Sequence, residues 1–228
     1  ATQSDHVVEI GAGTGALTHP LLESGAQVVA IEKDPRCEQV LAELKYQFPH
    51  TFSYHIADVT ETDLTALAPQ NSILTGNLPY NVGTQIVLQG LAAEQHFKRH
   101  LYLLQKEVVQ RICSSPGTAD WGRLGVICNI KAECQHLFDI PPGAFFPPPK
   151  VTSAFVKLMP TADFSTPYHE KNLERLTRQA FGQRRKMLRA SLKGLLTKED
   201  LEKTGIAPTQ RPETLTLHQL AALSLRLK

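Results

Sequence analysis

The sequence predicts an α/β fold, in which a mostly parallel sheet domain is followed by a smaller, all-helical domain. Short β-branched runs alternate with helical stretches through most of the first 160 of the 228 residues. A glycine-rich loop, Gly11–Gly15, follows the first of these runs and opens a helical stretch. After Pro160 the pattern is helical to the end of the sequence. We therefore expect residues 1–160 to form the sheet domain and residues 161–228 the helical domain.

The expected strands of the sheet domain are apolar runs bounded by turn residues. They cover residues 6–10, 27–31, 52–56, 72–76, 101–104, 126–130, 134–138 and 151–157. Helices are expected over residues 16–24 and from Pro35, which suits a first helical turn, to about Gln47. Since strands and helices alternate, the sheet should be largely parallel with helices on both faces. Such sheets bind their ligands at the carboxyl ends of the strands.

The helical domain is expected to begin after a polar, proline-bounded segment at residues 161–167. Its apolar residues recur at helical spacing, at Leu173, Leu176, Ala180, Phe181, Leu188, Leu192, Leu195 and Leu196. The last helix is predicted over residues 216–227.

Composition is that of a soluble globular protein, with 42% hydrophobic and 20% charged residues and a net charge of +2. No apolar stretch approaches the length of a membrane span, and the first six residues resemble no targeting peptide. We expect a monomeric, cytoplasmic protein with no membrane partner. Its cysteines form no CxxC pair and are expected as reduced thiols, at Cys37, Cys113, Cys128 and Cys134.

The tetrapeptide Asn77-Leu78-Pro79-Tyr80 directly follows a buried-strand pattern and is suited to binding a planar amine. The Asn77 side-chain oxygen and a neighbouring backbone carbonyl can each accept a hydrogen bond from an exocyclic NH2 group, while the Tyr80 ring stacks on the heterocycle. Drawing the amine protons toward acceptors frees the nitrogen lone pair for attack. The motif therefore predicts the reaction centre of an amine-alkylating enzyme.

The glycine loop can turn tightly and point helix N-terminal amides at an anion, although a tight β–α turn without a ligand is the alternative. Glu32 ends the second strand, where an acidic residue can hold ribose hydroxyls or simply cap a helix. Glu9 lies inside the first strand, where a carboxylate is costly unless it binds the loop amides or a cationic ligand. Asp58 could accept a hydrogen bond from an adenine amine or cap a turn.

In this order, Val8–Gly15, Glu32, Asp58 and Asn77–Tyr80 resemble the motifs of class I S-adenosylmethionine-dependent methyltransferases that act on adenine. The more specific resemblance is to the bacterial small-subunit ribosomal RNA adenine dimethyltransferase family, and it covers nearly the whole chain. It extends over segments at residues 104–109, 122–124, 145–154 and 179–186.

This resemblance implies a Rossmann-like sheet and the transfer of methyl groups from S-adenosylmethionine. The acceptors would be the exocyclic amines of two adjacent adenosines in 16S ribosomal RNA, modified during ribosome biogenesis. The implied catalytic residues are Asn77, Leu78, Pro79, Tyr80 and Phe145. The implied cofactor contacts are Glu9, Gly11, Gly13, Gly15, Glu32, Lys33, Asp58, Val59 and Asn77.

Phe145 precedes a proline-stiffened segment and is expected to sandwich the target adenine against Tyr80, since base-modifying enzymes take the base out of its stack. A core phenylalanine beside a proline-rich turn is the alternative. Family members also carry an N-terminal Gln-Asn-Phe-Leu-like segment that closes over the methionine end of the cofactor. The printed sequence has no counterpart, so we expect its cofactor site to lack that lid.

The distribution of Lys and Arg residues predicts a nucleic-acid partner. Residues 178–198 contain no Asp or Glu, whereas a merely solvated helix face would mix acids among its bases. We expect phosphate contacts from Lys106, Arg111, Arg123, Lys150, Arg178, Arg184, Arg185, Lys186 and Arg189. The family resemblance makes the partner ribosomal RNA of a small-subunit assembly intermediate.

Other functions stay open at this point. A relative that methylates large-subunit ribosomal RNA and confers antibiotic resistance would share the active site, and a ribosome-assembly binding factor with secondary catalysis would share the basic surface. A dinucleotide oxidoreductase is a further alternative, but it would not explain the presence of Asn77–Tyr80. His96 and His100 have helical spacing but no evident third ligand, so no metal site is predicted. Trp121 is expected to pack or to lie in a surface loop, with RNA stacking as the alternative.

Overall fold

The computed structural model describes residues 1–93, 96–162 and 164–227. The chain forms two compact units. The first comprises Ala1–Val109 and Ala132–Pro160, and the second comprises Gln110–Lys131 and Thr161–Lys228. From the sequence, residues 110–131 are expected in the first domain, but the structure packs them into the helical unit.

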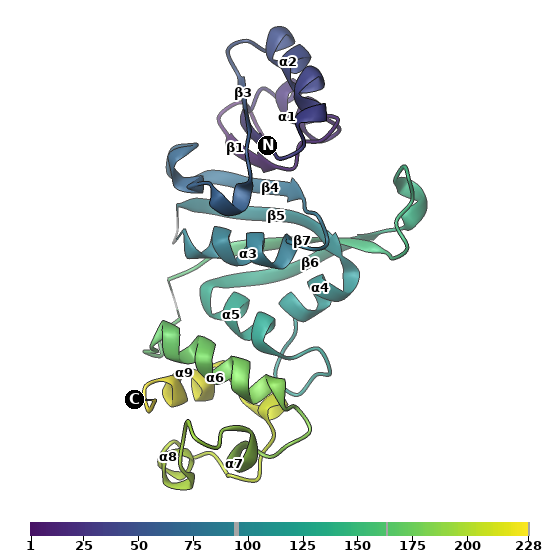
Figure 1. Cartoon of the computed structure of the whole chain (residues 1–228). Coiled ribbons are helices and arrows are strands. Elements are labelled where there is room, and N and C mark those ends of the chain that lie inside the picture. Colours follow the sequence, from purple (N-terminus) through teal and green to yellow (C-terminus); the bar gives the residue numbers. More distant parts are fainter. Residues whose placement is uncertain (94–95, 163, 228) are drawn as a thin grey trace. The chain divides into compact units, whose positions relative to one another are not determined.

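The first unit is built on a mixed sheet, which has seven strands among the described residues (Figure 1). Their order across the sheet is β3-β2-β1-β4-β5-β7-β6. Neighbours from β3 to β5 are parallel, whereas β7 pairs antiparallel with both β5 and β6. The strands are β1 (His6–Ile10), β2 (Gln27–Glu32), β3 (Phe52–Ile56), β4 (Ser72–Asn77), β5 (Phe97–Gln105), β6 (Ala132–Ile140) and β7 (Ser153–Pro160). The predicted mostly parallel α/β sheet is confirmed.

The helices of this unit follow the strands in alternation. The predicted helix from Pro35 begins with a 3-10 turn, in which the Asp34 carboxylate accepts a hydrogen bond from the Arg36 amide at 2.9 Å. The α-helices are α1 (Thr18–Glu23), α2 (Glu38–Gln47), α3 (Gly83–Ala92) and α4 (Lys106–Ile112), the last of which leads into the second unit. The 3-10 turns are η1 (Pro35–Cys37), η2 (Val59–Glu61), η3 (Leu64–Ala66) and η4 (Pro142–Ala144).

Apolar packing under the glycine loop holds the first strands in place. Val28 and Ala30 of β2 share a buried cluster with Leu22 of α1 and with Leu41 and Leu44 of α2. Burying such side chains stabilises a fold by about 1.5–3 kcal/mol each. The ends of β1 and β2 are therefore fixed, and so are the polar residues that follow them.

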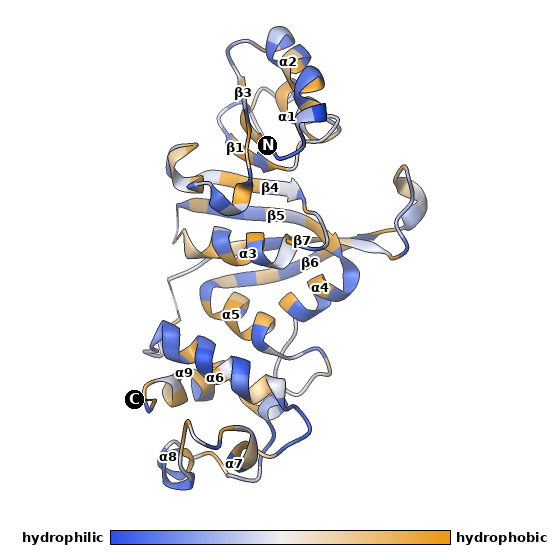
Figure 2. Cartoon of the chain, viewed as in Figure 1, coloured by the Kyte–Doolittle hydropathy of each residue, from blue (hydrophilic) through white to orange (hydrophobic). Residues whose placement is uncertain are grey.

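The second unit is helical. Its elements are α5 (Arg123–Lys131), α6 (Glu170–Gly182), α7 (Leu188–Ser191), α8 (Lys198–Lys203), η5 (Pro212–Thr214) and α9 (Leu217–Ser224). Capping boxes start α8 at Thr197 and α9 at Thr216, which satisfies amides that a helix start leaves unpaired. Along α6 the visible side is largely hydrophilic (Figure 2), while Leu173, Leu176 and Ala180 are buried.

The predicted strand at residues 126–130 is wrong, because these residues belong to helix α5. Val126, Ile127, Cys128 and Ile130 are all buried, so the run shows neither a strand period nor a helix period in its apolar pattern. Val126 and Ile130 share one core with leucines of α6, α7 and α9.

Trp121 is fully buried in this same core and donates its indole N–H to the Leu215 carbonyl at 3.0 Å. The packing interpretation of Trp121 is therefore confirmed. A membrane-crossing helix, which would need a long apolar run, is not found in the part of the chain that the structure describes.

Candidate active site

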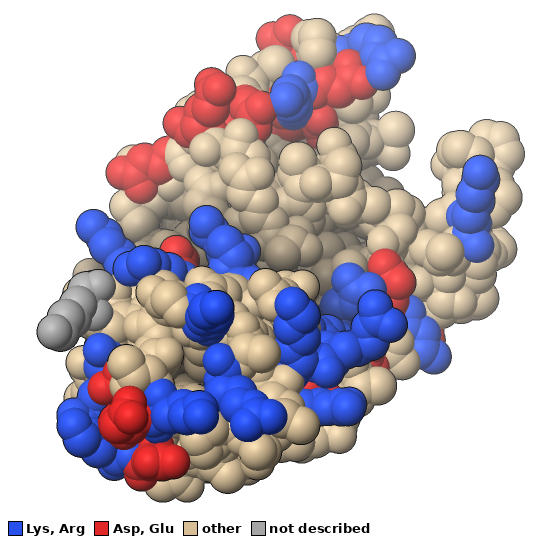
Figure 3. All heavy atoms as spheres, turned by 60° about the horizontal axis from the view of Figure 1, so that its bottom comes forward, with Lys and Arg blue, Asp and Glu red and all other residues tan. Residues whose placement is uncertain are grey.

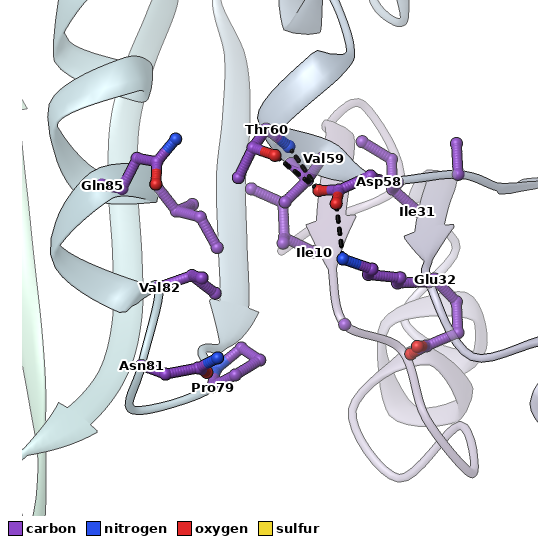
Figure 4. Close-up of a pocket in the computed structure, with 14 residues that line it drawn as sticks. Ile10, Ile31, Glu32, Asp58, Val59, Thr60, Pro79, Asn81, Val82 and Gln85 are labelled. Atoms are coloured by element: carbon purple, nitrogen blue, oxygen red, sulfur yellow. Dashed lines mark hydrogen bonds and ion pairs between the residues drawn. The ribbon is translucent and has the colours of Figure 1, made fainter.

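Cavities open where the parallel strands end. The strand-end cavity, of about 430 Å³, is lined by Ile10, Gly11, Ile31, Glu32, Lys33, Ala57, Asp58, Val59, Thr60, Pro79, Asn81, Val82, Gln85 and Ile86 (Figure 4). The loop cavity, of about 320 Å³, is lined by Glu9, Gly11, Ala12, Gly13, Thr14, Ala16, Leu17, Asn77, Leu103 and Phe155. The aromatic cavity, of about 340 Å³, is lined by Asn77, Leu78, Pro79, Tyr80, Phe145, Phe146, Pro147 and Pro149.

Shared residues make these cavities neighbours. Gly11 lines both the strand-end and the loop cavity, and Asn77 lines both the loop and the aromatic cavity. The sheet brings Gly11 and Asn77 together because β1 pairs with β4 in the register Ile10 opposite Gly76. A Cβ atom on Gly11 would lie 3.4 Å from the Asn77 carbonyl oxygen. Strand order reverses between β1 and β4, and open α/β sheets bind ligands at such a switch point.

The strand-end cavity combines apolar walls with two carboxylates. Figure 4 shows Val82 and Gln85 on one side, across from Ile10 and Val59. Its apolar walls suit a flat heterocycle, and the carboxylates at its edge suit hydroxyl or amine donors.

Each of these carboxylates already has backbone or side-chain partners. Glu32 accepts hydrogen bonds from the Gly13 and Asp34 amides, both at 2.8 Å. Asp58 accepts from the Thr60 amide at 2.9 Å, so it caps η2 as in the alternative interpretation, and it forms an ion pair with Lys33 at 2.6 Å. The hydrogen bond from Lys33 is the largest cause that lowers the pKa of Asp58 to about 2. Carboxylate oxygens have further lone pairs, so both groups can still accept from a ligand.

Glu9 is the unusual group of the loop cavity. It is 1% exposed, and its Oε2 atom is buried without a hydrogen-bond partner among the described residues. Burial raises the pKa of Glu9 to about 7, and the nearby charge of Glu32 acts in the same direction. Of the partners expected from the sequence, the loop amide of Gly13 bonds Glu32 instead. A cationic ligand group would satisfy the buried oxygen.

Gly15 has a packing role. It has a φ of +79°, and a Cβ atom there would lie 2.7 Å from Leu44 Cδ1 of α2. It lines none of the three cavities described above.

The aromatic cavity is shaped by the predicted tetrapeptide. Leu78 is buried and donates its amide to the Leu103 carbonyl at 3.1 Å, which anchors the turn on β5. The Tyr80 hydroxyl lies 3.2 Å from Ser153 Oγ at the start of β7. Asn77 is exposed, and its side-chain amide has no hydrogen-bond partner among the described residues. The side chain is therefore available to a ligand at the junction of two cavities.

Several lining residues were not predicted from the sequence. Gln85 lies on the first turn of α3, close behind the tetrapeptide, and that position is the signal that could have identified it. Ser153, which contacts the Tyr80 hydroxyl but lines none of the three cavities, stands in the segment that carries the family resemblance. Leu103 and Phe155 carry no such signal, because they are ordinary strand residues whose neighbours are set by the pairing of β5 with β7.

The two histidines have separate partners. His96 Nε2 lies 2.9 Å from the Ala68 carbonyl, and His100 Nδ1 lies 3.0 Å from the Tyr102 hydroxyl. Within the described ranges, no group of three or more potential metal ligands is found.

Comparison with known proteins identifies the family. All of residues 1–228 match the model of a family described as ribosomal RNA adenine dimethylase. The chain belongs to this family. It is 45% identical to Ribosomal RNA small subunit methyltransferase A of Rhodospirillum rubrum, over 96% of this chain and 76% of the relative. It is 42% identical to the protein of the same name from Pseudomonas aeruginosa, over 100% of this chain and 85% of the relative.

Solved structures agree with this ribosomal RNA adenine dimethylase assignment. A dimethyladenosine transferase from Plasmodium falciparum has a TM-score of 0.82 at 25% identity, covering 99% of this chain and 90% of its own. The 23S rRNA methyltransferase ErmE has a TM-score of 0.71 at 24% identity, covering 99% and 92%, a likeness in fold alone. The predicted family, Rossmann-like fold and methyltransferase activity on ribosomal RNA adenine are confirmed. The family uses a methyl donor of the S-adenosylmethionine type.

The basic residues of this dimethylase fall in both units. Arg178, Arg185, Lys186 and Arg189 are exposed on the second unit, where Figure 3 shows Lys and Arg side chains gathered on the face that comes forward. Arg184 is also exposed, but it donates hydrogen bonds to the carbonyls of Ala119 at 2.6 Å and Trp121 at 3.0 Å.

The remaining predicted phosphate contacts differ in surroundings. In the first unit, Lys106 forms an ion pair with Asp139 at 2.6 Å, and Lys150 is exposed. In the second unit, Arg111 is exposed and Arg123 is half-buried.

Proposed function

We propose that this chain transfers methyl groups from S-adenosylmethionine to the N6 amines of two adjacent adenosines in small-subunit ribosomal RNA. The observation that carries the proposal is that Asn77 lines both the loop cavity and the aromatic cavity. A residue at that junction can bind an acceptor amine while lying beside the methyl donor. The names of the relatives favour the small subunit over the large one.

The cavities fit the cofactor by their chemistry. The apolar strand-end cavity, with Glu32 and Asp58 at its edge, suits an adenosine. Glu9, whose Oε2 is buried without a partner among the described residues, suits the positive charges of the methionine part. Lys33 orients Asp58 through their ion pair, and Gly11 and Gly13 allow the ligand to approach the backbone.

The target adenine would enter the aromatic cavity between Tyr80 and Phe145. Its N6 amine would donate to the Asn77 side-chain oxygen and to a backbone carbonyl of the tetrapeptide, Leu78 contributing its carbonyl only. Bound S-adenosylmethionine would supply an electrophilic methyl carbon. The amine nitrogen would bond to this carbon as the sulfur–carbon bond breaks, sulfur would keep the electron pair, and the proton lost from the amine would pass to water. The protein contributes mainly alignment and polarisation of the amine.

The exposed Lys and Arg side chains of the second unit would contact the RNA phosphates. Lys150 and Lys106, the latter paired with Asp139, would contribute from the first unit. A monomer acting on a cytoplasmic assembly intermediate of the small subunit is part of the proposal.

The test is Asn77→Ala, assayed in single-turnover methyl transfer from radiolabelled S-adenosylmethionine to small subunits from unmethylated cells. We expect the rate to fall about 10²–10³-fold, the loss that follows removal of one polarising contact. RNA affinity should change little, because the basic surface is intact. Gln47→Ala, an exposed amide at the end of α2, is the control and should transfer normally.

Wild-type outcomes separate the alternatives. Label in small-subunit dimethyladenosine supports the proposal. Label only in free large-subunit RNA would indicate a large-subunit ribosomal RNA methyltransferase. Binding to small subunits without transfer of label would indicate a ribosome-assembly binding factor.

A further inference from the structure

Phe146 is a large apolar side chain that the fold leaves in water. It is 101% exposed, as much as an isolated residue, although it lines the rim of the aromatic cavity together with Tyr80 and Phe145. Single exposed apolar residues are common on proteins. This one stands beside a cavity that the proposed function assigns to a nucleobase.

Backbone geometry separates Phe146 from its neighbour. Phe145 is extended, with φ −117° and ψ 154°, and successive side chains of an extended chain point to opposite sides. Phe145 is half-buried, whereas Phe146 is fully exposed. The two rings therefore do not close on one base from the same side.

The segment that holds Phe146 is stiff and almost uncharged. Residues 140–153 contain five prolines, which fix φ, and Lys150 is their only charged residue. The contact between Tyr80 and Ser153 ties the start of β7 to the tetrapeptide. A flat ring held on a stiff support loses little conformational entropy when it stacks.

We propose that Phe146 is a stacking platform for the nucleobase next to the target adenine. The inference rests on the proposed function, since an RNA strand that delivers one base into the aromatic cavity must leave across the rim. Extruding that base removes a stacking partner from its neighbour, and an aromatic face at the rim replaces it. Lys150 provides a charge for the adjoining phosphate. With two adjacent adenosines as substrate, the second adenosine is the stacked neighbour in one of the two methylations, because a fixed ring meets only the neighbour on one side of the target.

The test compares Phe146→Ala, Phe146→Leu and Phe146→Tyr with Tyr46→Ala, an 87% exposed aromatic on α2 that lines none of the three cavities. RNA fragments carry 2-aminopurine, a fluorescent adenine analogue, at the neighbour position. Wild type, Phe146→Tyr and Tyr46→Ala should quench this fluorescence on binding, whereas Phe146→Ala and Phe146→Leu should not. For Phe146→Ala, KM for RNA should rise about 5- to 100-fold with kcat nearly unchanged, as expected for loss of one base stack.

Two results would overturn the inference. One is unchanged quenching in Phe146→Ala, and the other is full function of Phe146→Leu, which would indicate a general apolar contact such as one with a protein. The proposed function fails separately, if wild type itself transfers no methyl group to small-subunit RNA.

Discussion

Replacing Glu9 with glutamine should make the stability of the first unit less dependent on pH. Glutamine has nearly the same shape as glutamate but cannot ionise. Glu9 is 1% exposed, and burial is the largest cause that raises its pKa from an ordinary 4.5 to about 7. The charge of Glu32 adds to the rise, and the Thr18 hydroxyl opposes it.

The sign follows from proton uptake. Because the folded-state pKa of Glu9 lies above its unfolded value, the folded state keeps its proton over a range where the unfolded chain has lost it. The stabilisation is complete below pH 4.5 and is lost as pH rises through about 7. At 1.36 kcal/mol per pKa unit, wild type should lose about 3 kcal/mol relative to Glu9→Gln across this range.

The assay is urea unfolding at pH 5 and pH 8.5, and the readout is hydrogen exchange of the backbone amides of β1 and β4. Intrinsic fluorescence would report the other unit, since the chain's one tryptophan, Trp121, lies in the helical core. Glu43→Gln, an exposed carboxylate on α2, is the control and should show no such pH dependence. A stability difference between wild type and Glu9→Gln that is equal at both pH values would refute the reasoning. Saturating S-adenosylmethionine should reduce the deficit of wild type at pH 8.5, because a ligand cation favours ionised Glu9.

Two further predictions concern an arginine pair and a glycine. Arg184→Ala should destabilise the second unit by about 1 kcal/mol or more through loss of its bonds to the loop carbonyls, measured by Trp121 fluorescence. Arg185→Ala should leave stability within about 0.5 kcal/mol and instead reduce the salt slope of RNA binding by about one; the opposite pattern would contradict both roles. Gly76→Ala should lower the free energy of unfolding by at least about 1–3 kcal/mol, since its Cβ would lie 2.3 Å from the Ile10 carbonyl oxygen. Gly143→Ala is the control, with nothing within 4 Å of the added atom, and equal losses would argue against the steric cause.

Much of the site could be predicted because parallel strands end at one edge of the sheet. Gly11, Glu32, Asp58 and Asn77 each end or closely follow a strand, so finding the strands was enough to bring these residues to that edge. The partners of each group could not be predicted in the same way. Glu32 bonds the Gly13 amide, a contact that depends on the path of the loop and not on any spacing in the sequence.

Burial explains why the strand prediction at residues 126–130 failed, and the hydrogen-bond partners of Arg184 could not be predicted from the sequence. Val126, Ile127, Cys128 and Ile130 are all buried, and this removes the periodicity that separates strand from helix. Arg184 looks like its neighbour Arg185 in sequence, yet its guanidinium bonds backbone carbonyls. Charge predicts that an arginine prefers the surface but not which acceptor it meets there.

The interleaved path of the chain has a practical consequence. The polypeptide passes from one unit to the other at residues 109–110, 131–132 and 160–161. Cutting the gene after Pro160 would therefore not release an intact catalytic fragment. Trp121, Val126 and Ile130 would remain attached to the sheet unit but lose the leucines that cover them, and the fragment would carry a newly exposed apolar surface. The helical unit is thus an integral partner in folding, not a removable appendage.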